Sequence, residues 1–410
     1  MKGEKILGTP FPVLGPVVRR HLASTVLASA VLLLVTVPIP AFGDGERISC
    51  FAIGWVDPAI NPFTAFFQVD PLFTYSVEPI HPTLSREEKR KLDRVYYPRS
   101  RDALIGDYDL MVFRNARIDH FTTRQLDDLH FAFSEGEMTS IVTHGPDWDE
   151  VWKVSSLYEI TPLREYDMIG GIRPYTVRFR REREPVFLPL VELGLEEVWG
   201  LGFHTMQVKQ GATIWADIVP YGLPWLVQWR PAGGDPGMQW VLPGGFNQEW
   251  FGESNRYAID FATNLILHSL GRQLISDIHS RREARHLISA FQARKVVVLD
   301  MADWADSFGA DTRELIERLF SIEAGAEEAV DLYLRRDYPA AITRMEQVSS
   351  EISLIAEDTV RLKDRALLWV FVSEWLVVTS VAILSGLTVW NLMVRRKKYR
   401  QVMVTRLVEP

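Results

Sequence analysis

Residues 375–394 form a stretch of twenty residues without a charged side chain, and this feature constrains the fold more than any other. At 1.5 Å per residue, a helix of this length crosses a hydrocarbon core of about 30 Å. Arg395-Arg396-Lys397-Lys398 follows directly, and the positive-inside rule places such a cluster in the cytoplasm. We therefore expect a transmembrane helix over residues 367–394 and a basic cytoplasmic tail over residues 395–410.

The beginning of the chain has the order of a secretory signal. Arg19-Arg20 precedes an uncharged run over residues 22–37, which is followed by prolines and by Ala41-Phe42-Gly43. Basic, apolar and small residues in this order predict a signal peptide over residues 1–43, cleaved after Gly43. The alternative is an uncleaved N-terminal anchor, which would make the protein two-pass instead of single-pass. Either way, we expect the main domain to lie outside the cytoplasm, at the cell membrane.

Charge and cysteine content exclude several classes of function. The net charge of -8 combines ends of +3 (residues 1–20) and +5 (residues 395–410) with a middle of -16. Since an acidic body repels phosphate backbones, we expect no nucleic-acid partner. Cys50 is the only cysteine, which excludes an intrachain disulfide and a cysteine-based zinc site.

Residues 44–272 are expected to form one α/β domain. In its first part, apolar runs at 48–55, 73–77, 110–113 and 138–143 predict strands, and charged or amphipathic segments between them predict helices. Thr122 and Gln125 have the spacing of a capping box, which starts one of these helices. This alternation predicts a mostly parallel sheet covered on both faces.

Shorter apolar runs after Pro162 predict an added antiparallel part and then a closing helix. Glycine and proline separate the runs, so we expect hairpins at the edge of the sheet. The closing helix is expected over residues 256–270. The predicted strands are 175–179, 186–190, 204–208, 212–219, 225–229 and 238–242.

Residues 273–366 are expected to form a helical stalk. Asp311 and Glu314 are spaced as a capping-box pair, and Asp337 with Pro339 predicts a tight hairpin between two helices. The last helix repeats apolar residues at alternating spacings of four and three, a pattern that requires a helical neighbour. The helices at 274–335 can provide this neighbour, and the alternative is an intermolecular coiled coil. The repeated positions are Ala341, Met345, Val348, Ile352, Ile355, Thr359, Leu362, Ala366 and Trp369.

The order of segments over roughly residues 46–272 resembles the class I glutamine amidotransferase-like fold, in its ThuA-like branch. The similar segments are Tyr108-Asp109-Leu110-Met111-Val112-Phe113, Phe121-Thr122-Thr123-Arg124-Gln125-Leu126-Asp127-Asp128-Leu129, residues 138–145, residues 224–230 and residues 260–267. The resemblance implies a flavodoxin-like parallel sheet. The expected fold class is therefore α/β, with an added antiparallel portion, a helical stalk and one transmembrane helix.

The residues that carry catalysis in that family are not found at the matching positions. Enzymatic members have a cysteine on a sharp turn after a strand, and the matching turn here is Thr143-His144-Gly145-Pro146. Their late His-x-Glu aligns with Asn247-Gln248-Glu249. Cys50 lies within the first strand and is expected to be a buried core residue. The resemblance therefore implies a domain without the family's thiol chemistry.

Ligands of open α/β sheets bind beyond the carboxyl ends of the strands. Here these ends present a polar set that can hold a small ligand, without an obvious pair of nucleophile and base. No histidine spacing indicates a metal site, and no glycine-rich loop indicates a phosphate-bearing cofactor. We therefore expect no metal and no cofactor. The candidate cleft residues are Asp57, Arg114, Asn115, His144 and Asp147.

These observations favour a membrane-anchored binding, sensor or assembly protein with a catalytically inert ectodomain. One alternative is an extracytoplasmic hydrolase or carbohydrate-active enzyme that uses two carboxylates, such as Asp57 and Asp147, in the strand-end cleft. Another is a transporter-associated subunit, which is compatible with Glu374 at the outer edge of the apolar stretch and with the cytoplasmic bases. The expected partners are the lipid bilayer and either a membrane protein or a second copy, which would bind through the helix at 339–394.

Overall fold

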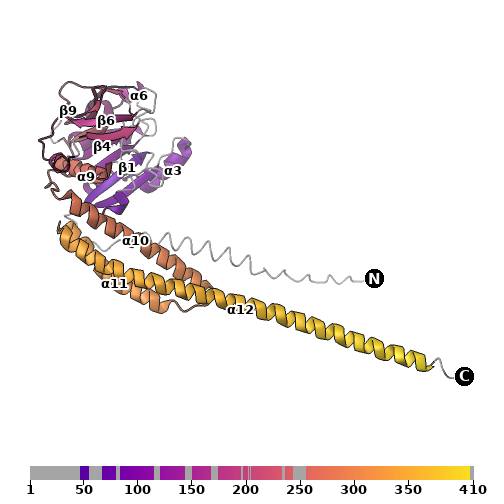
Figure 1. The fold of residues 1–410 in the computed structure, drawn as a ribbon. Helices are drawn as coiled ribbons and strands as arrows, with labels where there is room; N and C mark the ends of the chain where they lie inside the picture. Colours follow the sequence, from indigo (N-terminus) through magenta and orange to yellow (C-terminus); the bar gives the residue numbers. More distant parts are fainter. Residues whose placement is uncertain are drawn as a thin grey trace, which may run out of the picture. The chain divides into compact units, whose positions relative to one another are not determined.

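The computed structural model describes most of the chain after residue 46 (Figure 1). The described residues are 47–54, 67–79, 84–114, 121–143, 150–167, 174–194, 197–201, 203, 205–232, 236–242 and 255–406. The predicted signal peptide lies outside these ranges. So does Asn61-Pro62, where an asparagine cap and a first-turn proline predict the start of a short helix.

Five parallel strands form the core of the main sheet. They are β1 (Ile48–Gly54), β2 (Phe73–Pro79), β3 (Leu110–Arg114), β4 (Thr139–Thr143) and β11 (Gln239–Leu242). Their spatial order is β2-β1-β3-β4-β11. Counted along the chain, this is the order 2-1-3-4-5 of flavodoxin-like folds. The predicted α/β fold class is therefore confirmed.

Four antiparallel strands extend the same sheet beyond β11. They are β10 (Leu223–Trp229), β9 (Thr213–Val219), β6 (Pro174–Phe179) and β7 (Glu197–Leu201), in that order. A second sheet pairs β5 (Leu163–Asp167) with β8 (Thr205–Val208). The predicted antiparallel addition is present, but the 204–208 strand belongs to the small sheet, where β5 supplies its partner.

The main sheet has a buried layer on each face. Along β1, Cys50 and Ala52 belong to one apolar cluster, whereas Phe51 and Ile53 belong to the other. The first cluster includes α9 (Ala258–Ser269), and the second includes α4 (Arg101–Asp107) and α5 (Thr123–Ser134). Thr122 and Gln125 form both bonds of the predicted capping box at the start of α5. The remaining helices of the α/β region are α3 (Arg86–Tyr96), α6 (Glu150–Lys153), α7 (Leu157–Ile160) and α8 (Leu188–Glu192).

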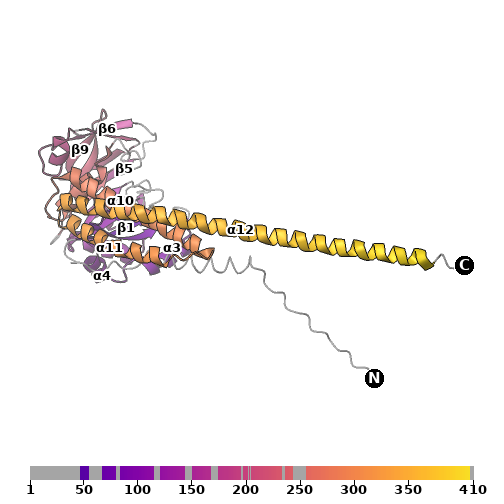
Figure 2. The same ribbon diagram turned by 60° about the horizontal axis from the view of Figure 1, so that its bottom comes forward.

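Three long helices follow the α/β part, namely α10 (Ile278–Ser307), α11 (Arg313–Leu334) and α12 (Tyr338–Arg406). Both views show α10 and α11 side by side with the first part of α12 (Figures 1 and 2). All predicted seam positions of α12 from Ala341 to Ala366 are buried or half-buried, whereas Trp369 is 70% exposed. The seam is therefore covered within the chain by α10 and α11, as the first of the two alternatives predicts.

Beyond the seam, α12 continues without cover from the other described helices and strands (Figure 2). Of the described helices, α12 alone is long and apolar enough to cross a membrane, and none of its apolar window is buried. The length and the apolar composition of α12 are the observations that favour a membrane-spanning helix. Within residues 375–394, the exposed large apolar side chains are Trp375, Leu376, Val377, Val378, Val381, Ile383, Leu384, Leu387, Val389, Trp390, Leu392, Met393 and Val394.

Three local predictions are wrong. Residues 186–190 do not form a strand, because α8 begins there with Pro189 in its first turn, where the fixed φ of proline favours a helix. The strand at 238–242 is predicted to belong to the antiparallel hairpins at the edge of the sheet. Instead, β11 lies inside the sheet, where it pairs in parallel with β4 and antiparallel with β10. Asp311 does not cap α11: its carboxylate accepts from the backbone and guanidinium of Arg313 instead.

Candidate functional site

Of the five residues predicted to line a cleft at the carboxyl ends of the parallel strands, only Arg114 belongs to the described residues. Arg114 is the last residue of β3. Asp57, Asn115, His144 and Asp147 lie outside the described residues, as does Asn247-Gln248-Glu249. The paired-carboxylate alternative, which depends on Asp57 and Asp147, therefore stays a prediction.

Arg114 gives this strand end a positive charge. Its side chain is half-buried, and burial lowers the pKa of the guanidinium from 12.5 to about 10. The group is still protonated at neutral pH, although its charge is poorly hydrated. A half-buried guanidinium of this kind is stable where anionic or strongly polar groups surround it.

Cys50 cannot act as a nucleophile in this fold. It lies within β1, between Tyr75 of β2 and Leu110 of β3, and its side chain is fully buried. Burial, and then the nearby Asp109 carboxylate, raises the pKa of the thiol well above its ordinary value. The thiolate is the reactive form, so the chain's single thiol is inert.

This burial gives a direct test. The native protein is expected to leave Cys50 unmodified by a maleimide reagent over a time in which a short cysteine peptide reacts completely. Denaturant should make the same residue fully reactive. Intact mass spectrometry measures both states, and rapid modification of the native chain would contradict the placement of Cys50 in the sheet.

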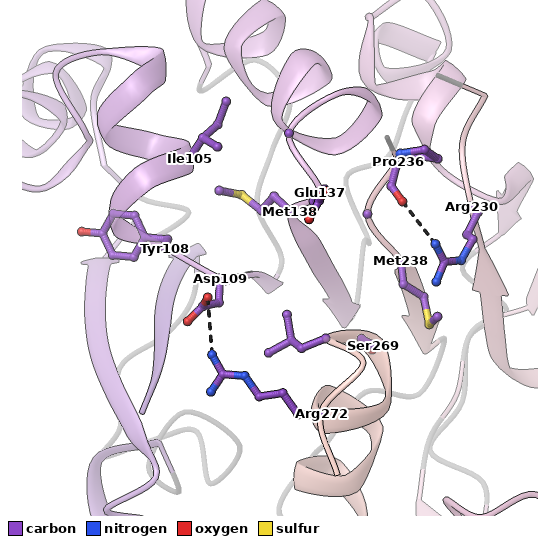
Figure 3. Close-up of a pocket in the computed structure, with 13 residues that line it drawn as sticks. Ile105, Tyr108, Asp109, Glu137, Met138, Arg230, Pro236, Met238, Ser269 and Arg272 are labelled. Atoms are coloured by element: carbon purple, nitrogen blue, oxygen red, sulfur yellow. Dashed lines mark hydrogen bonds and ion pairs between the residues drawn. The ribbon is translucent and has the colours of Figure 1, made fainter. Parts of the chain in front are cut away.

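A pocket of about 460 Å³ lies at the opposite, amino-terminal edge of the parallel sheet (Figure 3). Its walls include Asp109, Met138 and Met238, each of which directly precedes one of the strands β3, β4 and β11. Ser269, the last residue of α9, and Arg272, in the segment that joins α9 to α10, complete it. The pocket therefore lies where the α/β part continues into the stalk.

Charged side chains of both signs line this pocket. The Asp109 carboxylate accepts from the backbone N–H of Ser49 at 2.9 Å and lies 3.8 Å from an Arg272 Nη atom. Arg272 also donates to the carbonyl of Arg47 at 3.3 Å. Arg230 lies on another wall and points toward the carbonyl of Pro236, at 3.5 Å (Figure 3). This arrangement suits the binding of a polar molecule.

The described lining of the pocket holds no activated nucleophile. Among these residues, Ser269 has the one hydroxyl besides Tyr108, and that hydroxyl donates to the carbonyl of Leu265 and accepts from the indole of Trp240. No group of three His, Cys, Asp or Glu side chains within the described ranges is placed to hold a metal ion. The described side chains of the lining are suited to bind a polar molecule.

A buried ionic network joins the α/β part to the stalk. Arg281 of α10 donates to Asp70, which precedes β2, and to Asp260 of α9. Arg285, one turn further along α10, holds both oxygens of Asp260 at 2.8 and 3.1 Å. Tyr333 of α11 donates to Asp70 at 3.0 Å. All five side chains are buried, so four segments are held together by charges away from water.

The network compensates for the cost of burying its own charges. Burial alone would raise the pKa of Asp260, but Arg285 and Arg281 more than reverse this and hold the pKa below 3.8. Burial would lower the pKa of Arg281, but Asp70, Tyr333 and Asp260 raise it further than burial lowers it. Each charge is therefore stable only while its partners are present.

The depressed pKa of Asp260 predicts acid sensitivity. An aspartate with a lowered folded pKa contributes stability that is fully present above its ordinary pKa of 3.8 and is lost as the pH falls through the folded value. The melting temperature of Asp260→Asn should therefore fall less between pH 5 and 3 than that of the wild type. Asp300→Asn, at an exposed position on α10, is the control and should keep the wild-type pH dependence. Equal pH dependence in all three proteins would contradict the proposed role of Asp260.

Comparisons with known proteins give distant structural likenesses only. No protein-family model and no curated protein matches the chain. Among solved structures, the chain is similar to the mmIFT52 N-terminal domain, with a TM-score of 0.35 and 10% sequence identity, over 53% of this chain and 96% of that chain. The strand order β2-β1-β3-β4-β11 by itself identifies the α/β fold class.

Sequence reasoning missed both the pocket and the ionic network. The rule for α/β sheets directs attention to the carboxyl ends of strands, whereas this pocket is at the amino ends. The network did leave one signal: Arg281 and Arg285 lie one turn apart on the same face of α10 as the apolar Ile278, Ala284 and Ile288. Two bases within an apolar face indicate buried partners.

Proposed function

We propose that this chain is a membrane-anchored binding, sensor or assembly protein, whose inert α/β domain is of the glutamine amidotransferase-like type. In this proposal, the domain lies outside the cytoplasm on the stalk, and α12 crosses the membrane once. A membrane-protein partner or a second copy would bind the exposed part of α12.

One observation carries the proposal: α12 runs without a break from the packed stalk into a fully exposed apolar stretch that ends at four bases. Apolar surface left in water costs about 25 cal/mol per Å², and the described part of the chain does not cover this stretch. A lipid bilayer can cover it entirely. The bases at its end then fix its orientation by the positive-inside rule.

Two further observations support the binding role. The single thiol is buried within β1, so the chemistry of the resembled enzymes is not available to this chain. The ionic network of Arg281, Arg285, Asp70, Asp260 and Tyr333 holds the domain firmly against the helices that lead to the membrane. In this proposal, a change at the pocket beside Asp109 and Arg272 would be passed on to the stalk.

The orientation of α12 in the membrane can be tested by labelling single introduced cysteines. Cys50 is buried, so single cysteines introduced elsewhere report without background. In intact cells that produce the full chain, Glu351→Cys on the stalk should react with a membrane-impermeant maleimide, whereas Tyr399→Cys should react only after permeabilisation. Both side chains are exposed. The reverse pattern, or labelling of both in intact cells, would overturn the proposed topology.

The inert character of the domain is tested separately. The purified full chain in detergent should release no ammonia from glutamine above the uncatalysed background. Turnover that Arg114→Gln abolishes would overturn the binding role and locate a reaction at the end of β3.

A further inference from the structure

Four consecutive bases, Arg395, Arg396, Lys397 and Lys398, directly follow the apolar stretch of α12. All four are exposed, and α12 remains helical through them to Arg406. Successive residues of an α-helix are rotated by about 100°, so four of them in a row surround the helix on all sides. We call these four residues the basic collar.

The collar has no acidic partner in the described part of the chain. No ion pair within the described ranges involves any of the four. On α12, the nearest acid is Glu374, at the other end of the apolar stretch. At 1.5 Å per residue, about 30 Å separates Glu374 from the collar, so its charge does not neutralise the bases. The counter-charge must therefore come from outside the described chain.

We propose that the basic collar binds the phosphate groups of anionic phospholipids in the cytoplasmic leaflet. This inference rests on the proposed transmembrane course of α12. Lipid headgroups surround a membrane helix on every side, as the four bases do. A protein partner or a nucleic acid would approach from one side and match a one-sided patch. Guanidinium groups bind phosphate oxygens through paired hydrogen bonds, and each juxtamembrane base adds to the attraction of an anionic leaflet.

The test uses the full chain in vesicles of phosphatidylcholine with a minor share of phosphatidylglycerol. After mild extraction, the ratio of the two lipids that remain bound to the protein is compared with their ratio in the vesicles. We expect phosphatidylglycerol to be enriched about tenfold around the wild type at low salt, since several bases act together. High salt should reduce this enrichment, because screening weakens the attraction.

The variant R395Q/R396Q/K397Q/K398Q should lose the enrichment. A matched control removes four exposed bases from the α/β part, K91Q/R94Q/R99Q/R183Q, and should retain it. Equal enrichment around both variants would overturn the proposal. Displacement of the lipid by inorganic phosphate would identify the ligand as free phosphate, and binding of an oligonucleotide in place of phosphatidylglycerol would identify nucleic acid. Both results contradict the lipid assignment.

The two proposals fail in distinguishable ways. The wild type and both variants should float with pure phosphatidylcholine vesicles, because the apolar stretch is unchanged in all of them. If the wild type does not float, the membrane anchor is overturned and the collar proposal with it. If the wild type floats but does not enrich phosphatidylglycerol, only the collar proposal is overturned.

Discussion

Replacing Arg281 with methionine is expected to destabilise the folded chain by about 3–5 kcal/mol, the usual cost of removing one partner from a buried ionic group. Arg281 is fully buried and contacts both Asp70 and Asp260. Methionine fills much of the same volume, so the loss comes from the carboxylates that remain buried with less compensation. Urea unfolding of the purified full chain measures the change.

Arg294→Met is the matched control for this prediction. Arg294 lies on the same helix but is exposed, and it donates to Ser353 at 3.2 Å. Its replacement is expected to change the free energy of unfolding by about 0.5 kcal/mol or less, as surface substitutions do. If Arg281→Met were as mild as this control, the network would not hold the stalk against the α/β part.

Introducing arginine at both Val381 and Leu384 is expected to remove the chain from the membrane. Both side chains lie within the exposed apolar stretch of α12, about midway between its ends. An arginine at the centre of a membrane helix costs about 2.5–3.5 kcal/mol for insertion, so the pair costs roughly 5–7 kcal/mol. Alkaline extraction of membranes, with detection of the protein in the pellet and the supernatant, measures the effect.

Conservative changes at the same two positions provide the control. Val381→Ile with Leu384→Val keeps both side chains apolar and should leave the protein in the pellet. The arginine variant should move to the supernatant or fail to accumulate, whereas its α/β part should keep its fold. Retention of the arginine variant in the pellet would show that α12 does not cross the bilayer.

The sequence predicted those elements whose signals are local. Leu110–Arg114 is a short apolar run with turn residues beyond it, and the Thr122–Gln125 capping box depends on residues three apart. The prediction of a strand at 186–190 is wrong because an apolar segment of five residues also suits a short helix, and Pro189 in the first turn favours the helix. The pairing of β11 with β4 joins segments about a hundred residues apart, for which periodicity gives no signal.

The functional residues were harder to predict for the same reason. The Tyr333–Asp70 hydrogen bond spans 263 positions along the chain, and the Arg281–Asp70 contact spans 211. Composition and spacing indicate that Arg281 and Arg285 require partners, but they do not say which acids supply them. Of the predicted cleft residues, only Arg114 is described, and its place at the end of β3 follows directly from the strand prediction.

The continuity of α12 has a mechanical consequence. Over its 69 residues this helix extends for about 100 Å, and after Pro339 it contains no proline. A helix without a kink transmits rotation along its axis, whereas a broken one absorbs it at the hinge. A rotation that reaches Tyr338 from α11 would therefore turn Tyr399 in the same sense. In the proposed topology, this rotation would carry a signal from one side of the bilayer to the other.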